Sequence, residues 1–124
     1  MSNSDHDRYV NLIDQISNLE LRFGRAFGIV HYYSIEKKDG EELLPFYQLE
    51  ASTKNQAGFA RESLRRYVAE GRPFHLELAQ MNLIASQKRA LAAIDFAIEK
   101  KGKLDNLEKW RRRIAEIDDI EAAL

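Results

Sequence analysis

Three histidines are the side chains of this chain best suited to acid–base catalysis or to metal binding. His6, His31 and His75 lie far apart in the sequence, and none has the spacing of a metal-ligating pair such as His-Glu-x-x-His. The chain has no cysteine, which excludes disulfides, thiolate catalysis and metal sites ligated by cysteine. We therefore expect no catalytic residue, no metal site and no cofactor, and we predict that the protein is not an enzyme.

Basic side chains gather in the middle of the chain. Residues 57–103 hold nine bases and five acids, whereas the whole chain has a formal net charge of -1. A basic patch of this kind could hold phosphates, which supply most of the non-specific affinity of proteins for nucleic acids. The candidate phosphate contacts are Arg61, Arg65, Arg66, Arg72, Lys88 and Arg89. The alternative is a solvated face, or one whose charges are paired within the chain.

Aromatic side chains form a second candidate surface, in this case for a protein partner. The candidate interface residues are Tyr32, Tyr33, Phe46, Tyr47 and Trp110. Exposed tyrosine and tryptophan are frequent at protein interfaces, where they contribute much of the binding energy. Adjacent residues of a strand point to opposite faces, so at least one of Tyr32 and Tyr33 is expected outside the core. The alternatives are that these rings cover an edge of the core, or that one of them stacks on a nucleobase.

The C-terminal segment has a polarised charge pattern. A basic run at residues 111–113 precedes an acidic run between residues 116 and 121. Acidic side chains near the C-terminus of a helix oppose its dipole, at a cost of about 0.3–1 kcal/mol each. Pairs four residues apart, such as Arg112 with Glu116, could offset this cost. The alternative is a basic surface nearby, in the same chain or in a second copy.

Residues 27–51 are predicted to form a β-hairpin after a first helix over residues 5–26, whose apolar residues recur at helical spacing. The first half of this segment is rich in β-branched and aromatic residues, which suit a strand. Asp39-Gly40 is a typical turn sequence, and Pro45 restricts the second strand to an edge of the sheet. The alternative is that residues 28–35 extend the first helix.

Three helices are expected in the rest of the chain, over residues 56–70, 74–101 and 105–124. Gly71 is a natural C-terminal stop for the first of them, and Pro73 favours the first turn of the next. The last two are joined by a short connection, which predicts an antiparallel helical hairpin.

Length and composition limit the class of protein. The chain has 124 residues, 44% of them hydrophobic, which suffices for one domain covering residues 1–124. We predict an α+β fold that is mostly helical, with an all-α fold as the alternative. No apolar run reaches the length of a membrane span, and the N-terminal residues lack the pattern of a signal peptide. We therefore expect a soluble, cytoplasmic protein without membrane contact.

Two functions are compatible with these features. The first is a non-enzymatic adaptor, inhibitor or accessory factor that binds a protein partner through a helical and aromatic interface. The alternative is an accessory nucleic-acid-binding protein that uses the basic patch in residues 57–103. For either function we expect a homodimer, because long helices and a marginally stable hairpin need more cover than one chain supplies.

Overall fold

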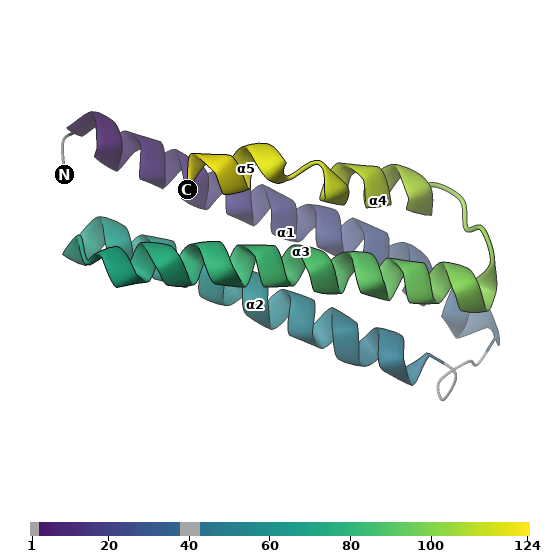
Figure 1. Cartoon of the computed structure of the whole chain (residues 1–124). Helices are drawn as coiled ribbons and strands as arrows, with labels where there is room; N and C mark the ends of the chain where they lie inside the picture. The colour runs from purple at the N-terminus through teal and green to yellow at the C-terminus, as the bar shows by residue number, and fades with distance from the viewer. Residues whose placement is uncertain (1–2, 38–42) are drawn as a thin grey trace.

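Helices make up almost all of the chain that the computed structural model describes, which is residues 3–37 and 43–124. They are α1 (Asn3–Lys37), α2 (Leu44–Glu70), α3 (Pro73–Lys101), α4 (Leu107–Ala115) and α5 (Asp118–Ala123). Figure 1 shows α1, α2 and α3 as long neighbouring rods, with α4 and α5 following one another along a fourth. The fold is an all-α bundle, and none of the described residues lies in a strand.

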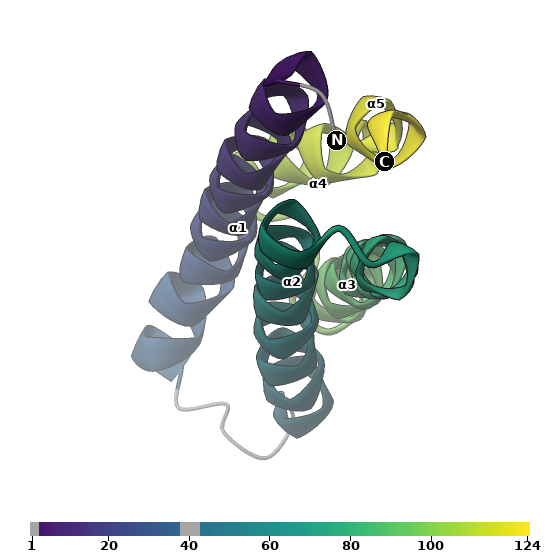
Figure 2. The same cartoon turned by 90° about the vertical axis from the view of Figure 1, so that its left-hand side faces the viewer.

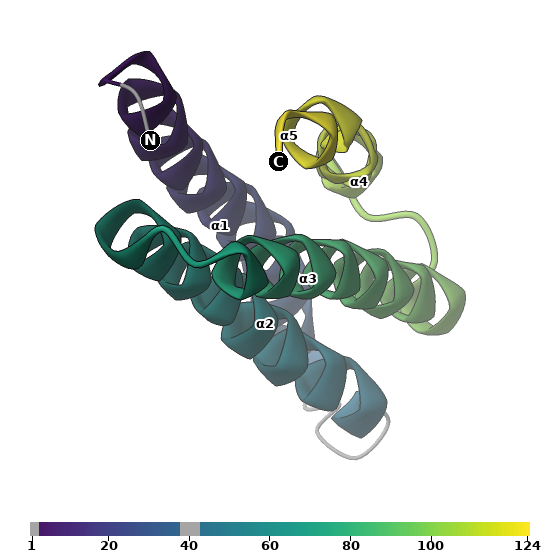
Figure 3. The same ribbon diagram turned by 60° about the vertical axis from the view of Figure 1, so that its left-hand side comes forward.

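Among the three long helices, α2 packs on both others, whereas α1 and α3 meet at few positions. α2 and α3 form a closely packed antiparallel hairpin, α1 packs on α2, and α4 packs on both α1 and α3. Figure 3 shows the same arrangement, with α4 and α5 on the side of α3 that lies away from α2. None of the helices in the described ranges is both long enough and apolar enough to cross a lipid bilayer.

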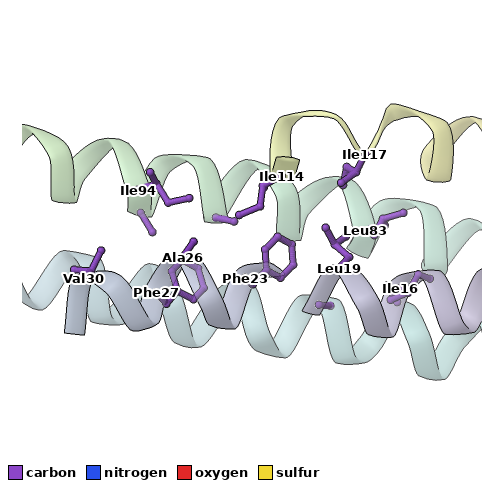
Figure 4. Close-up of a cluster of buried hydrophobic side chains, with 14 of the residues drawn as sticks. Ile16, Leu19, Phe23, Ala26, Phe27, Val30, Leu83, Ile94, Ile114 and Ile117 are labelled. Carbon is purple, nitrogen blue, oxygen red and sulfur yellow. The ribbon is translucent and has the colours of Figure 1, made fainter. Parts of the chain in front are cut away.

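One stripe of side chains on α1 supplies much of the core. Its buried members recur at three- and four-residue steps and are Leu12, Ile16, Leu19, Phe23, Phe27 and Val30. Figure 4 shows this stripe facing Leu83 and Ile94 of α3 and Ile114 and Ile117 of the C-terminal segment. Burial of each such side chain stabilises the fold by about 1.5–3 kcal/mol, so α3 and α4 pack against this stripe.

The predicted β-hairpin over residues 27–51 is wrong, and with it the α+β fold class. α1 continues to Lys37, so the alternative extension of the first helix is the observed structure. Phe27 and Val30 are buried on the core stripe, and their burial outweighs the local preference of this segment for a strand. The expected Asp39-Gly40 turn lies outside the described residues.

The segment expected as the second strand belongs to α2. Pro45 lies in the first turn of that helix, where its missing N–H would have no helical partner in any case. It therefore marks the start of a helix and not the edge of a sheet. The helix expected over residues 56–70 accordingly begins at Leu44.

The last expected helix, residues 105–124, is divided between α4 and α5. The chain leaves the helix after Ala115 and starts again at Asp118, and Ile117 is buried at the break. The polarised charge pattern gives a physical reason for this division. An acidic residue such as Asp119 would oppose the dipole near the end of one long helix, whereas in the first turn of α5 the dipole favours it.

Candidate functional site

An open groove of about 550 Å³ lies between the C-terminal half of α1 and the segment that joins α3 to α4. It is lined from α1 by Arg25, Gly28, Ile29, Tyr32 and Tyr33, and from the other side by Asp105, Asn106 and Trp110. Three aromatic residues selected from the sequence, Tyr32, Tyr33 and Trp110, therefore meet at one place although they come from distant parts of the chain. We refer to this site as the α1–α4 groove.

Helical spacing brings the α1 residues of the groove to one face. Arg25, Gly28 and Tyr32 follow one another at three- and four-residue steps, so their positions line up along the helix. Gly28 has no side chain, and a Cβ atom placed on it would meet no other atom within 4 Å. The wall between Arg25 and Tyr32 is therefore open to a ligand.

The second wall depends on the turn that starts α4. Asn106 has a left-handed backbone, with φ at 66°, immediately before the helix. The backbone N–H of Trp110 donates to the carbonyl oxygen of Asn106 at 3.2 Å, so Trp110 lies in the first turn of α4. Arg22 of α1 holds α4 in place, because its guanidinium donates to the carbonyl oxygen of Arg113 at 3.0 Å. α4 consequently runs alongside α1 (Figure 1).

Cationic side chains surround the half-buried ring of Trp110. The guanidinium carbon of Arg113 lies 4.8 Å from the ring centroid, that of Arg25 lies 5.6 Å from it, and the Lys109 ammonium lies 5.8 Å from it. Cation–π contacts at exposed sites contribute about 0.5–1 kcal/mol each. Within residues 3–37 and 43–124 no carboxylate forms an ion pair with any of these three cations. Of the three, only Arg25 lines the groove, so Arg25 is the cation that a ligand in the groove contacts.

The two tyrosines differ in their burial. Tyr32 is 63% exposed, whereas Tyr33 is half-buried, and their ring centroids lie 5.3 Å apart in an edge-to-face arrangement. Tyr33 therefore supports the position of Tyr32, whose ring is accessible to a partner. An exposed ring that is held by its neighbour loses little conformational freedom on binding.

The remaining two aromatic candidates lie away from the groove. Phe46 is fully buried between α1 and α2, where its ring packs edge-to-face on Phe27 at 5.6 Å. Tyr47 is half-buried and stacks on the imidazole of His31, with the ring centroids 5.5 Å apart. Tyr47 covers an edge of the core, which is the alternative role considered for these rings from the sequence, whereas Phe46 is part of the core itself.

His31 joins α1 to α2 through a buried carboxylate. Its Nε2 atom lies 2.8 Å from both carboxylate oxygens of Glu50, which is 8% exposed. The ammonium of Lys54 lies 3.5 Å from the same carboxylate. The charge of a buried carboxylate requires such partners, so this cluster has a structural role at the helix interface. His31 does not line the α1–α4 groove.

His75 makes the corresponding contact within the α2–α3 turn. Its imidazole is buried, and Nε2 lies 2.6 Å from a carboxylate oxygen of Glu70. This hydrogen bond lowers the pKa of Glu70, and the nearby charges of Arg72 and Arg66 act in the same direction. Among the described residues no three histidine, aspartate or glutamate side chains come together in a cluster that could hold a metal ion.

The structure divides the basic patch that the sequence indicated. Arg61 lies 2.9 Å from a carboxylate oxygen of Glu20 on α1, so it forms an ion pair between helices. Arg65 lies 3.3 Å from Glu62 of its own helix. These pairs correspond to the alternative of charges paired within the chain.

Of the other members of the basic patch, Arg66 and Arg72 lie near Glu70 at the α2–α3 turn, whereas Lys88 and Arg89 lie more than three turns into α3. Arg89 donates to the hydroxyl of Ser52 across the α2–α3 interface at 3.2 Å. Arg66, Arg72 and Lys88 are exposed. The patch therefore contributes separate exposed cations and does not form one continuous row for a phosphate backbone.

Sequence reasoning did not select the three cations around Trp110. Arg25 was overlooked because the first helix was expected to end at residue 26. A helix continued to Lys37 would have placed Arg25 and Tyr32 on one face, two turns apart. Lys109 and Arg113 flank Trp110 at one- and three-residue distances, a local pattern that the sequence does display.

Comparison with known proteins adds no relative for this chain. No protein-family model matches the sequence, and no curated protein matches it. No solved structure matches the fold. The geometry of the α1–α4 groove is consequently the basis for a functional assignment.

Proposed function

We propose that this chain is a non-enzymatic protein-binding protein, an adaptor, inhibitor or accessory factor whose binding site is the α1–α4 groove. The observation that carries this proposal is the convergence of Tyr32, Tyr33 and Trp110 on one open groove beside Arg25. Tyrosine, tryptophan and arginine are the residues that contribute most to binding at protein interfaces. We also propose that the protein is cytoplasmic and that it assembles as a homodimer.

The groove suits a protein segment that carries an aromatic or aliphatic side chain next to a carboxylate. Ile29 and the aromatic rings offer apolar contact area for the first of these side chains. Arg25 offers a guanidinium that can bind the carboxylate through two parallel hydrogen bonds. The carboxylate of Asp105 can accept a hydrogen bond from the backbone of the bound segment.

The nucleic-acid alternative has less support from the same geometry. The lining of the groove holds a single base, Arg25. Binding of single strands requires a positively charged path along the backbone in addition to stacking rings. The cations around Trp110 gather at one ring, and Arg61 and Arg65 are engaged with glutamates.

Selection of a random peptide library on the purified chain tests this proposal. We expect the enriched peptides to share an aromatic or aliphatic residue beside aspartate or glutamate. Trp110 is the only tryptophan of the chain, so its fluorescence reports directly on binding of the synthetic peptides in the groove. The Tyr32→Ala variant should weaken their affinity by about tenfold or more, because an exposed aromatic anchor is removed.

A matched variant separates groove binding from a general effect on α1. Leu21 is an exposed apolar residue of the same helix outside the groove, and Leu21→Ala should leave the affinity unchanged. Equal losses for the two variants, or peptides that share no motif, would contradict the proposal. A mixed single-stranded oligonucleotide that quenches Trp110 where no selected peptide does would favour nucleic acid instead.

A further inference from the structure

The face of α3 that points away from the bundle carries a stripe of residues at alternating three- and four-residue steps. The members of this α3 stripe are Phe74, Glu77, Met81, Ile84, Lys88 and Leu91. All of them are exposed except Leu91, which is half-buried. This spacing is the one with which a helix presents a seam to a single partner helix.

The α3 stripe is chemically complementary to a second copy of itself that runs in the opposite direction. Two copies of α3 that run antiparallel about a two-fold axis at the centre of the stripe form three kinds of layer, each present twice. The layers pair Met81 with Ile84, Glu77 with Lys88, and Phe74 with Leu91 of the second copy. Apolar side chains meet at the centre and at both ends, and an acid meets a base in between. A two-fold interface requires this self-complementarity.

The two charges of the stripe specify the orientation of the pair. Neither Glu77 nor Lys88 forms an ion pair with another residue in the described part of the chain. A parallel arrangement would place Glu77 against Glu77 and Lys88 against Lys88, which is repulsive. Exposed ion pairs add little affinity, so their contribution here is the choice of the antiparallel register.

In this register the two α3 helices overlap from Pro73 to Ala92, over about 30 Å. α4 contacts α3 both inside and beyond this overlap: Gln87 donates to the carbonyl oxygens of Ile114 and Ala115 at 3.2 Å, and the carboxylate of Asp95 accepts from Arg111 at 2.6 Å. The side chains of Met81, Ile84 and Lys88 are exposed with α4 in place, so α4 leaves the centre of the stripe open to a second copy.

We infer that the α3 stripe is the interface of an antiparallel homodimer, and that a second copy of this chain occupies this face. The inference rests on the proposed homodimer and specifies its surface and register. It does not depend on what binds in the α1–α4 groove, because the two surfaces share no residue.

Sedimentation equilibrium of the full chain over a range of concentrations tests the surface. We expect the wild-type chain to dimerise and the Met81→Lys variant to raise the dimer dissociation constant by about a hundredfold, because both copies lose an apolar contact and bury an ammonium. Leu21→Lys is the matched control. Leu21 is 64% exposed and Met81 is 66% exposed, so both changes are tolerated by the fold, and the control should leave dimerisation unchanged.

Charge reversal tests the register. Glu77→Lys alone and Lys88→Glu alone should each raise the dissociation constant by about three- to tenfold, because each places like charges opposite one another. The double variant Glu77→Lys/Lys88→Glu exchanges the charges of both layers and should restore the wild-type value.

Each contrary result points to a different error. A chain that stays monomeric at every concentration would overturn the homodimer and this interface together, and would leave groove binding untouched. A dimer that survives Met81→Lys would overturn the interface alone. Failure of the double variant to recover what both single variants lose would overturn the antiparallel register.

Discussion

The α1–α4 groove and the α3 stripe both combine accessible apolar side chains with unpaired charge, but they are built differently. The groove joins α1 to the start of α4, and its lining holds one base, Arg25, and one acid, Asp105, beside three aromatic rings. The stripe belongs to one helix and carries one acid and one base. The groove is a hollow between two different elements, so it suits a partner of different shape, whereas a surface whose residues match those of the same surface in reverse order can bind a copy of itself.

The two surfaces also depend on the core to different degrees. The walls of the groove are separate helices, so its shape exists only while α4 is packed on α1. The α3 stripe needs only that α3 is helical, since all its members lie on one face of that element. Loss of core packing should therefore abolish the groove before it abolishes the stripe.

The largest expected effect comes from Phe27→Ala, which removes a fully buried ring from the core stripe of α1. The change should lower the free energy of unfolding by about 3–5 kcal/mol, through lost burial and the cavity left behind. Urea denaturation at a protein concentration where the chain is monomeric measures this loss. Met81→Ala on the α3 stripe is the comparison and should change the same quantity by less than about 0.5 kcal/mol. Similar losses for both variants would show that Met81 is packed in the monomer.

A pair of charge reversals tests whether the two surfaces are independent. Arg25→Glu should weaken binding of the selected acidic peptides by about tenfold, or about 1.4 kcal/mol, and leave the dimer dissociation constant unchanged. Glu77→Lys should have the converse effect, because it lies outside the groove. Peptide titration by Trp110 fluorescence and sedimentation equilibrium measure the two quantities on the same samples. A change of both quantities by either variant would mean that the surfaces are coupled.

The sequence predicted the bounds of α3 well because residues at its two ends mark where the helix begins and ends. Pro73 opens the helix, and Gly102, whose φ is 78°, ends it where other residues would be strained. The segment 27–51 was mistaken because its composition favours a strand, while its burial pattern continues the helical stripe through Phe27 and Val30. Composition predicted a strand and periodicity a helix. The helix forms because the segment packs against residues distant in sequence, which local sequence does not reveal.

Only part of the candidate site could be predicted, because its formation also depends on contacts between distant segments. Tyr32, Tyr33 and Trp110 could be selected by residue type, but their proximity depends on the packing of α4 against α1. The prediction of a basic patch was wrong for Arg61 because it ignored a contact between helices. Arg61 was counted as available for phosphate, and its ion pair with Glu20 crosses from α2 to α1, which spacing along one helix cannot reveal.

The smallest expected effect is that of substituting Gly28, which lines the α1–α4 groove. Gly28 and Gly24 are both exposed residues of α1 with ordinary helical backbone, and a Cβ atom on either would meet no other atom within 4 Å. Gly28→Ala and Gly24→Ala should each raise the free energy of unfolding by about 0.4–1 kcal/mol, because alanine restricts the unfolded chain more than glycine does. Urea denaturation measures both gains, and a loss of stability for Gly28→Ala would contradict a helix at this position.

Peptide binding then distinguishes the two glycines. Only Gly28 lines the α1–α4 groove, so Gly28→Ala places a methyl group in the opening between Arg25 and Tyr32. We expect it to weaken binding of the selected peptides by about fivefold, since one extra methyl group in an open binding site costs about 1 kcal/mol, the low end of the range for a pocket. Gly24→Ala should gain the same stability and leave the affinity unchanged. If both variants bind as the wild type does, the bound segment does not enter the groove at Gly28, and its contacts must be confined to the rings and to Arg25.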